Sequence, residues 1–157
     1  MKIKLLTIGK TDDKNLAQLI ADYQKRLNHY IKFEIEVIND IKNAKNVSEN
    51  QQKEKEGALI LKRILPTDQL ILLDEQGEGF RSVAFSRFLQ KKMNSRIKQL
   101  VFVIGGPYGF SEAVYQKAHA KVSLSKMTFS HQMIRLFIVE QLYRACTILR
   151  NEPYHHE

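Results

Sequence analysis

The amino-acid sequence predicts an α/β fold in which helices cover both faces of a mostly parallel sheet. Short apolar segments with high β propensity alternate with segments of helical periodicity along the whole chain. No internal repeat, low-complexity tract or linker interrupts this alternation. Because 157 residues are enough to bury one core, we predict a single domain over residues 1–157.

The first three elements follow from simple periodicity. Residues 2–8 alternate apolar and polar side chains and are predicted to form the first strand. Asp12 or Asp13 can cap a helix over residues 14–27, whose apolar positions follow helical spacing. Residues 33–38 alternate again and are predicted to form the second strand.

A loop and a charged helix come next. Residues 40–47 are polar and rich in asparagine, which favours a loop. Ser48 followed by Gln51 resembles a capping box, so we expect a helix from there to about Ile64, and Pro66 ends it.

The middle of the chain contains the most apolar strand. Residues 69–73 predict a short buried strand, and the DEQGEG sequence of residues 74–79 predicts a turn after it. Residues 82–93 form an amphipathic helical pattern. Residues 101–104 are all apolar and rich in β-branched side chains, which is typical of a strand buried on both faces.

The last third is predicted to contain two helices and one strand. Ser111 is placed to cap a short helix, and residues 121–124 predict one more strand. Residues 133–149 form a long helix that is apolar almost all round, which requires burial on more than one side. Residues 151–157 form a tail.

The glycine-rich turn after the buried strand is the first candidate site. Ligands of open α/β sheets bind beyond the carboxyl ends of the strands, and Gly105 and Gly106 allow another molecule to approach the backbone. With Gly109 they give GGxxG, which matches neither the dinucleotide fingerprint nor a P-loop. A tight turn without a ligand would contain the same glycines.

Polar residues before and along the final helix form further candidates. The segment SLSKMTFSH, residues 123–131, offers hydroxyls and backbone donors, and its Ser130 can cap the helix. Glu140 and Arg144 are spaced as a helix-face pair. Arg135 lies on the apolar side and needs either an internal carboxylate or a bound anion.

Charge indicates the kind of partner. The formal net charge of +8 points to a polyanion, most often nucleic acid, although a solvated lysine-rich surface would give the same balance. Basic residues cluster around one predicted helix and could follow a phosphate backbone, or could simply be solvated: Arg87, Lys91, Lys92, Arg96 and Lys98.

Several classes are not expected. Cys146 is the only cysteine, so we expect no disulfide framework and no metal site, as in a protein of the cytoplasm. The start MKIKLLTIGK is interrupted too early by Gly9 and by charges for a signal peptide. No stretch approaches the roughly 18 apolar residues that cross a membrane.

Several separated motifs, in order along the full length, resemble the RlmH family of SPOUT methyltransferases, which act on pseudouridine in 23S ribosomal RNA. Besides the start of the chain, they are LLDEQGE (72–78), VFVIGGPYG (101–109), LSKMTFSHQMIR (124–135), EQLYRA (140–145) and PYH (153–155). The chain departs at Ser130, where members commonly have proline, and this concerns the entry angle of the last helix.

The resemblance implies a SPOUT-type α/β knot, with a trefoil knot near the carboxyl terminus. It also implies a homodimer and S-adenosylmethionine bound in the knot. The implied cofactor contacts are Leu73, Gly105, Leu124, Ser125, Lys126, Met127, Thr128 and Phe129.

The expected reaction is methyl transfer to N3 of a pseudouridine, on the assembled ribosome. The predicted catalytic residues are His155, Tyr154 and Arg135, and the predicted RNA contacts are His131, Arg144, Tyr154 and His155. His155 would accept the N3 proton or contact the substrate, and Tyr154 would stack on the base. His131 would orient its segment, and Arg135 or Arg144 would hold phosphate. A methyltransferase of another RNA, such as transfer RNA, and a noncatalytic RNA-binding protein are the alternatives.

Overall fold

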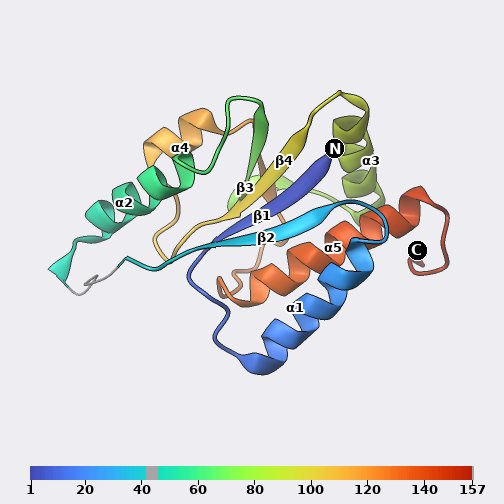
Figure 1. Cartoon of the computed structure of the whole chain (residues 1–157), viewed down its shortest axis with the longest axis horizontal. Coiled ribbons are helices and arrows are strands. Elements are labelled where there is room, and N and C mark those ends of the chain that lie inside the picture. The colour runs from blue at the N-terminus through green and yellow to red at the C-terminus, as the bar shows by residue number, and fades with distance from the viewer. Residues whose placement is uncertain (42–45, 157) are drawn as a thin grey trace.

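The computed structural model describes residues 1–41 and 46–156. Its centre is a five-stranded sheet in the order β2-β1-β4-β3-β5, in which every neighbouring pair is parallel (Figure 1). The strands are β1 (Lys2–Ile8), β2 (Phe33–Ile38), β3 (Asp68–Gly79), β4 (Gln99–Ile104) and β5 (Ala120–Ser123). The predicted parallel α/β architecture is therefore confirmed.

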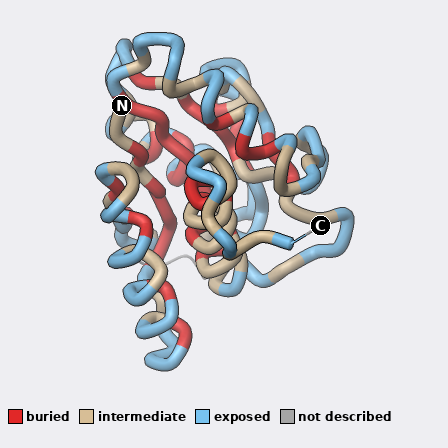
Figure 2. The backbone as a smooth tube through the Cα atoms, turned by 90° about the vertical axis from the view of Figure 1, so that its right-hand side faces the viewer, coloured by how far each residue is buried: buried red, intermediate tan, exposed pale blue. Residues whose placement is uncertain are grey.

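In the part of the chain that the structure describes, five helices cover the two faces of the sheet. They are α1 (Lys14–Leu27), α2 (Glu49–Leu61), α3 (Ser82–Asn94), α4 (Glu112–Lys117) and α5 (Met133–Leu149). The helices α1, α3 and α5 pack together on one face, and α2 and α4 pack on the other (Figure 1). Figure 2 shows the buried residues concentrated in the strands and on the inward sides of the helices.

The two faces of the sheet build two apolar clusters. In β1, Ile3 and Leu5 belong to the cluster beneath α1, α3 and α5, whereas Leu6 and Ile8 belong to the cluster beneath α2 and α4. All six residues of β4 are buried, as the apolar run of residues 100–104 predicts for a central strand covered on both faces. Burial on both faces thus explains why the strand has no alternating pattern.

The prediction of a turn at residues 74–79 is wrong, because β3 continues through this segment. The pairing of β3 with β5 shifts register between Leu73 and Glu78, as at a β-bulge. A side chain at Gly77 would lie only 2.6 Å from the backbone of Val122, so glycine allows the two strands to approach here. The glycines that suggest a turn in the sequence serve an irregular strand instead.

The capping predictions are confirmed at two helices and not at a third. The Asp13 carboxylate accepts from the Leu16 amide at 2.7 Å, and Ser48 and Gln51 form the predicted capping box. Ser111 stands at the N-cap position of α4, but its hydroxyl makes no capping bond. It is buried instead against Gly57, where an added side chain would meet it at 2.2 Å. Ser111 therefore packs between α2 and α4 and does not form the predicted capping bond.

Three expectations remain outside these observations. Part of the predicted loop over residues 40–47 lies outside the described residues. The trefoil knot and the single domain over residues 1–157 stay predictions. Among the described residues, no helix is long and apolar enough to cross a membrane.

Candidate functional site

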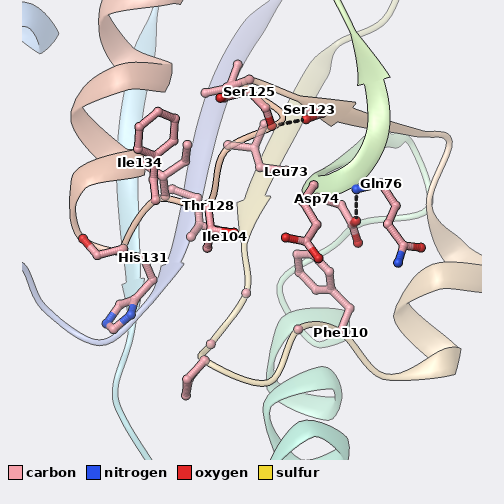
Figure 3. Close-up of a pocket in the computed structure, with 18 of the residues that line it drawn as sticks. Leu73, Asp74, Gln76, Ile104, Phe110, Ser123, Ser125, Thr128, His131 and Ile134 are labelled. Atoms are coloured by element: carbon pink, nitrogen blue, oxygen red, sulfur yellow. Dashed lines mark hydrogen bonds between the residues drawn. The ribbon is translucent and has the colours of Figure 1, made fainter.

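A cavity of about 640 Å³ lies at the carboxyl ends of β4 and β5, beside the irregular middle of β3 (Figure 3). Three segments of the chain line it, between residues 73 and 76, 104 and 110, and 122 and 131, together with Ile134 of α5 and Tyr115 of α4. Parallel strands end at the same edge of a sheet, which brings these distant segments together. The cavity therefore occupies the usual ligand position of this architecture.

The glycine turn forms the floor of the cavity. The amide of Gly109 donates to the carbonyl of Gly106 at 3.2 Å, and Gly109 has φ +77°, in the left-handed region that glycine adopts readily. Behind the turn, a side chain at Gly106 would meet the Glu56 carboxylate at 2.3 Å. The turn is therefore backed closely by α2.

A fixed carboxylate forms one wall. Asp74 Oδ1 accepts from the Gln76 amide at 2.8 Å (Figure 3), and its Oδ2 accepts from the Tyr115 hydroxyl at 2.6 Å. Burial, with the hydrogen bond to Asp74, raises the pKa of Tyr115 to about 12. Tyr115 thus stays protonated and holds the carboxylate in one orientation.

The segment between β5 and α5 forms the opposite wall and is ordered by its own side chains. The Ser123 hydroxyl donates to the carbonyl of Ser125 at 2.8 Å, and the Ser125 hydroxyl accepts from the Met127 amide at 2.9 Å. Ser130 Oγ accepts from the amide of Met133, the first residue of α5, at 3.1 Å, although the N-cap position itself is occupied by Gln132, which makes no side-chain capping bond. Hydroxyls therefore set the path of this wall.

Arg135 ties this wall to the first strand. Its side chain is 2% exposed, and its guanidinium donates to the carbonyls of Ile8 at 2.8 Å, Gly9 at 3.0 Å and His131 at 3.0 Å, and to the Thr11 hydroxyl at 3.1 Å. Burial lowers the pKa of Arg135. Neither the carboxylate nor the bound anion expected for Arg135 is needed, because backbone carbonyls satisfy its donors.

Comparisons with known proteins agree over the whole length. A family model described as "Predicted SPOUT methyltransferase" matches residues 1–155. The chain is 72% identical to the Ribosomal RNA large subunit methyltransferase H of Flavobacterium psychrophilum, with all of both chains covered. The chain belongs to the RlmH family of SPOUT methyltransferases.

Other relatives support this membership. The protein of the same name from Parabacteroides distasonis is 66% identical, again over all of both chains. A solved structure of a probable methylase family protein from Haemophilus influenzae matches with a TM-score of 0.51 at 14% identity, covering 99% of this chain and 70% of that one. That likeness concerns the fold alone. S-adenosylmethionine is the methyl donor of SPOUT methyltransferases.

Most residues that the RlmH resemblance assigns to the cofactor meet at the cavity. Seven of the eight line it: Leu73, Gly105, Leu124, Ser125, Met127, Thr128 and Phe129. Lys126 is exposed and does not line it, whereas His131 does. Sequence reasoning missed Asp74, Phe110 and Tyr115 in the walls. Asp74 directly follows the predicted strand at residues 69–73, and the sequence analysis assigned it only to a turn.

The carboxyl-terminal tail lies on the far end of α5. The predicted pair is confirmed, since Arg144 Nη2 lies 2.6 Å from Glu140 Oε1. The Tyr154 hydroxyl donates to the same oxygen at 3.0 Å, and the Arg144 guanidinium lies 4.7 Å from the centre of the Tyr154 ring. Burial is the main cause that raises the pKa of Tyr154. The tail is thus packed on its own helix.

His155 is oriented by the same arginine. Its Nδ1 lies 3.4 Å from Arg144 Nη1. Arg144 follows Ile134 of the cavity by ten residues, or about 15 Å along a helix. Tyr154 contacts Glu140, six residues or about 9 Å after Ile134, and neither Tyr154 nor His155 lines the cavity of its own chain.

Within residues 1–41 and 46–156, no group of three or more histidine, cysteine, aspartate or glutamate side chains is placed to hold a metal ion.

Proposed function

We propose that this chain is an S-adenosylmethionine-dependent methyltransferase of large-subunit ribosomal RNA, and that it methylates N3 of a pseudouridine in 23S RNA on the assembled ribosome. The observation that carries the proposal is the convergence of three distant segments on one cavity at the carboxyl edge of the sheet. The relatives named Ribosomal RNA large subunit methyltransferase H, which match over the full length, support the choice of RNA.

The cavity suits the cofactor in size and chemistry. Its volume of about 640 Å³ is within the range of small-molecule sites. Leu73, Ile104 and Leu124 supply apolar surface for an adenine ring, Ser125 and the strand-end backbone supply hydrogen bonds, and the Asp74 carboxylate suits an ammonium group. When bound, S-adenosylmethionine supplies an electrophilic methyl group on a sulfonium sulfur.

The chain's own residues must then hold the base in line with that methyl group. The proton on N3 must leave, which requires a base or an ordered water. His155 is the candidate for proton acceptor or substrate contact, and Arg144 lies beside its Nδ1. Tyr154 offers a ring for stacking on the extruded base. Arg144, which is half-buried, is better placed for a phosphate than Arg135.

The separation of the tail from its own cavity supports a homodimer in which each tail completes the partner's site. Tyr154 and His155 contact α5 at Glu140 and Arg144, about 9 and 15 Å along the helix from Ile134, and neither lines the cavity of their own chain. Along α5, Met133 is 40% exposed, and Phe137 and Ile148 are half-buried. The same face of α5 carries the Glu140–Arg144 pair, and a partly exposed face that mixes apolar side chains with an ion pair is suited to a second copy of the chain.

Methyl transfer to ribosomes tests the proposal directly. We expect ribosomes that lack the modification to gain one methyl group on a pseudouridine of 23S RNA, located by mass spectrometry. Replacing Tyr154 and His155 by alanine should leave cofactor affinity, measured by calorimetry, nearly unchanged. It should lower turnover by about 100-fold. His156→Ala, at the exposed neighbouring position, serves as the matched control.

Each part of the proposal has its own refuting result. Methylation of transfer RNA instead of 23S RNA would favour the other RNA substrate, and methylation at another atom would exclude N3. A silent calorimetric titration with no methyl transfer would favour a noncatalytic RNA-binding protein. Mixing Gly105→Arg protomers with Tyr154→Ala/His155→Ala protomers should restore activity if sites are shared, and no restoration would refute the shared site.

A further inference from the structure

The segment around α3 combines a high density of cationic residues with a complete lack of acidic ones. Between Glu78 and Glu112 there is no aspartate or glutamate, and there are six cationic residues: Arg81, Arg87, Lys91, Lys92, Arg96 and Lys98. These six account for most of the formal net charge of +8. The positive charge of the protein is therefore concentrated in α3 and the turns that flank it.

Four of these cations form one exposed surface, which we call the α3 ridge: Arg87, Lys91, Arg96 and Lys98. Arg87 and Lys91 are one helical turn apart, and the other two follow in the turn between α3 and β4. Among the described residues, none of the four takes part in an ion pair, whereas Lys2, Lys4, Arg63 and Arg144 each pair with a glutamate.

Lys92, on the same helix as Arg87 and Lys91, makes no ion pair among the described residues. Burial and the neighbouring Lys91 charge both lower the pKa of Lys92, and no carboxylate opposes them. The Lys92 amine instead donates to the side-chain carbonyl of Gln69 at 2.8 Å and lies over the ring of Phe88. The four cations of the ridge, which make no ion pair among the described residues, are available to an external anion.

Arg96 provides an independent observation. It has φ +59°, in the left-handed region, at the position after the helix end where glycine is strongly favoured. A non-glycine residue there carries backbone strain, and such strain is found where function requires a particular side chain. An arginine at this position presents its guanidinium on the ridge at the expense of local stability.

The ridge also lies at the end of the molecule to which the tail belongs. Helices that connect parallel strands run back from the carboxyl to the amino edge of the sheet, so α3 ends at the amino edge. There the carbonyl of Lys98 accepts from the amide of Lys2 at the start of β1. The helix α5 starts at the cavity and packs against α3, and its far end carries the tail (Figure 1).

We propose that the α3 ridge is an RNA-binding surface that contacts the phosphates of the ribosomal RNA segment whose base is presented beside the tail. The inference rests on the proposed function and adds the surface by which the substrate is held. Phosphates, which carry one negative charge per nucleotide, match a row of unpaired lysines and arginines. The ridge supplies affinity and register, whereas the cavity and tail supply the chemistry.

A salt titration of ribosome binding tests the ridge. The ridge variant carries Lys91→Gln, Arg96→Gly and Lys98→Gln, and the control carries Lys55→Gln, Lys62→Gln and Lys117→Gln on the exposed side of α2 and α4. Binding to large ribosomal subunits is measured from about 50 to 200 mM KCl at constant Mg²⁺. Removing three phosphate contacts should reduce the slope of log affinity against log salt by about three. The wild type should then lose about 40-fold more affinity over this range than the ridge variant.

Stability and cofactor measurements separate binding from folding. Arg96→Gly alone should bind ribosomes more weakly yet have a Tm at or above that of the wild type, because glycine relieves the strain at φ +59°. Arg96→Lys, which keeps the charge, should retain the binding. All variants should keep the wild-type affinity for S-adenosylmethionine, because the ridge lies outside the cavity.

The outcomes distinguish the ridge from the proposed function. If the wild type methylates ribosomes and the ridge variant has the same salt slope, the ridge proposal is overturned and the function stands. Equal losses in the ridge and control variants would overturn it too, because net charge alone would then account for binding. Binding to phosphatidylserine vesicles without binding to ribosomes would assign the ridge to a membrane and overturn it. A wild type that neither binds nor methylates ribosomes would overturn both proposals.

Discussion

Replacing Arg135 by methionine is expected to destabilise the fold rather than weaken RNA binding specifically. Methionine keeps most of the apolar stem but removes all four hydrogen bonds of the guanidinium. The carbonyls of Ile8 and Gly9 lose their Arg135 donors in buried surroundings, whereas the acceptors at His131 and Thr11 are only partly buried and can bind water.

The magnitude follows from the two buried acceptors. Each unsatisfied buried acceptor costs about 1–3 kcal/mol, so the free energy of unfolding should fall by about 3 kcal/mol after allowing for the relieved desolvation of the charge. For a chain of 157 residues this corresponds to a Tm lower by about 10 °C. The matched control is Arg144→Met on the same helix, where a partly exposed pair with Glu140 contributes about 1 kcal/mol or less.

Urea unfolding followed by far-ultraviolet circular dichroism, together with calorimetry, measures both variants. Ribosome binding is then compared at a temperature where all proteins remain folded. A free energy of unfolding for Arg135→Met within about 0.5 kcal/mol of the wild type would refute the reasoning. Unchanged stability with lost ribosome binding would instead restore Arg135 as a phosphate ligand.

Two further changes test the surroundings of the cavity. Burial raises the pKa of Glu56 above 4.5, so the contribution of its protonated form to the free energy of unfolding is complete below pH 4.5 and is lost as pH rises through the raised pKa. Glu56→Gln should remove this pH-dependent loss, measured by urea unfolding across that range. Parallel pH profiles of the free energy of unfolding for both proteins would contradict the assignment. Gly77→Ala should lower the free energy of unfolding by about 1–3 kcal/mol, because its methyl group would overlap the Val122 backbone. Gly79→Ala in the same strand meets nothing within 4 Å and should be nearly neutral, so equal effects of the two alanines would refute the overlap.

The site was predictable where its residues follow strands. The glycine turn and the 124–129 segment each follow a strand that the apolar pattern indicates, and a parallel sheet must bring such ends to one edge. Asp74 was not predicted as a site residue, because the segment DEQGEG has the composition of a turn. Only its pairing with β5 makes this segment part of a strand. Glu56 gave no signal at all, since a glutamate in a charged helix looks solvated until its helix packs on Gly106.

The sequence by itself determined the order of helices and strands, the parallel arrangement and the membership of the RlmH family. Periodicity, caps and motifs are properties of neighbouring residues, which is why the sequence is enough for them. Only the tertiary structure decided what the charged side chains of the last helix do. Arg135 and Arg144 are similar in sequence, yet one is enclosed by the carbonyls after β1 and the other is held between Glu140 and the tail. That difference arises from which surfaces the helix covers, and packing between segments more than 100 residues apart sets it for Arg135.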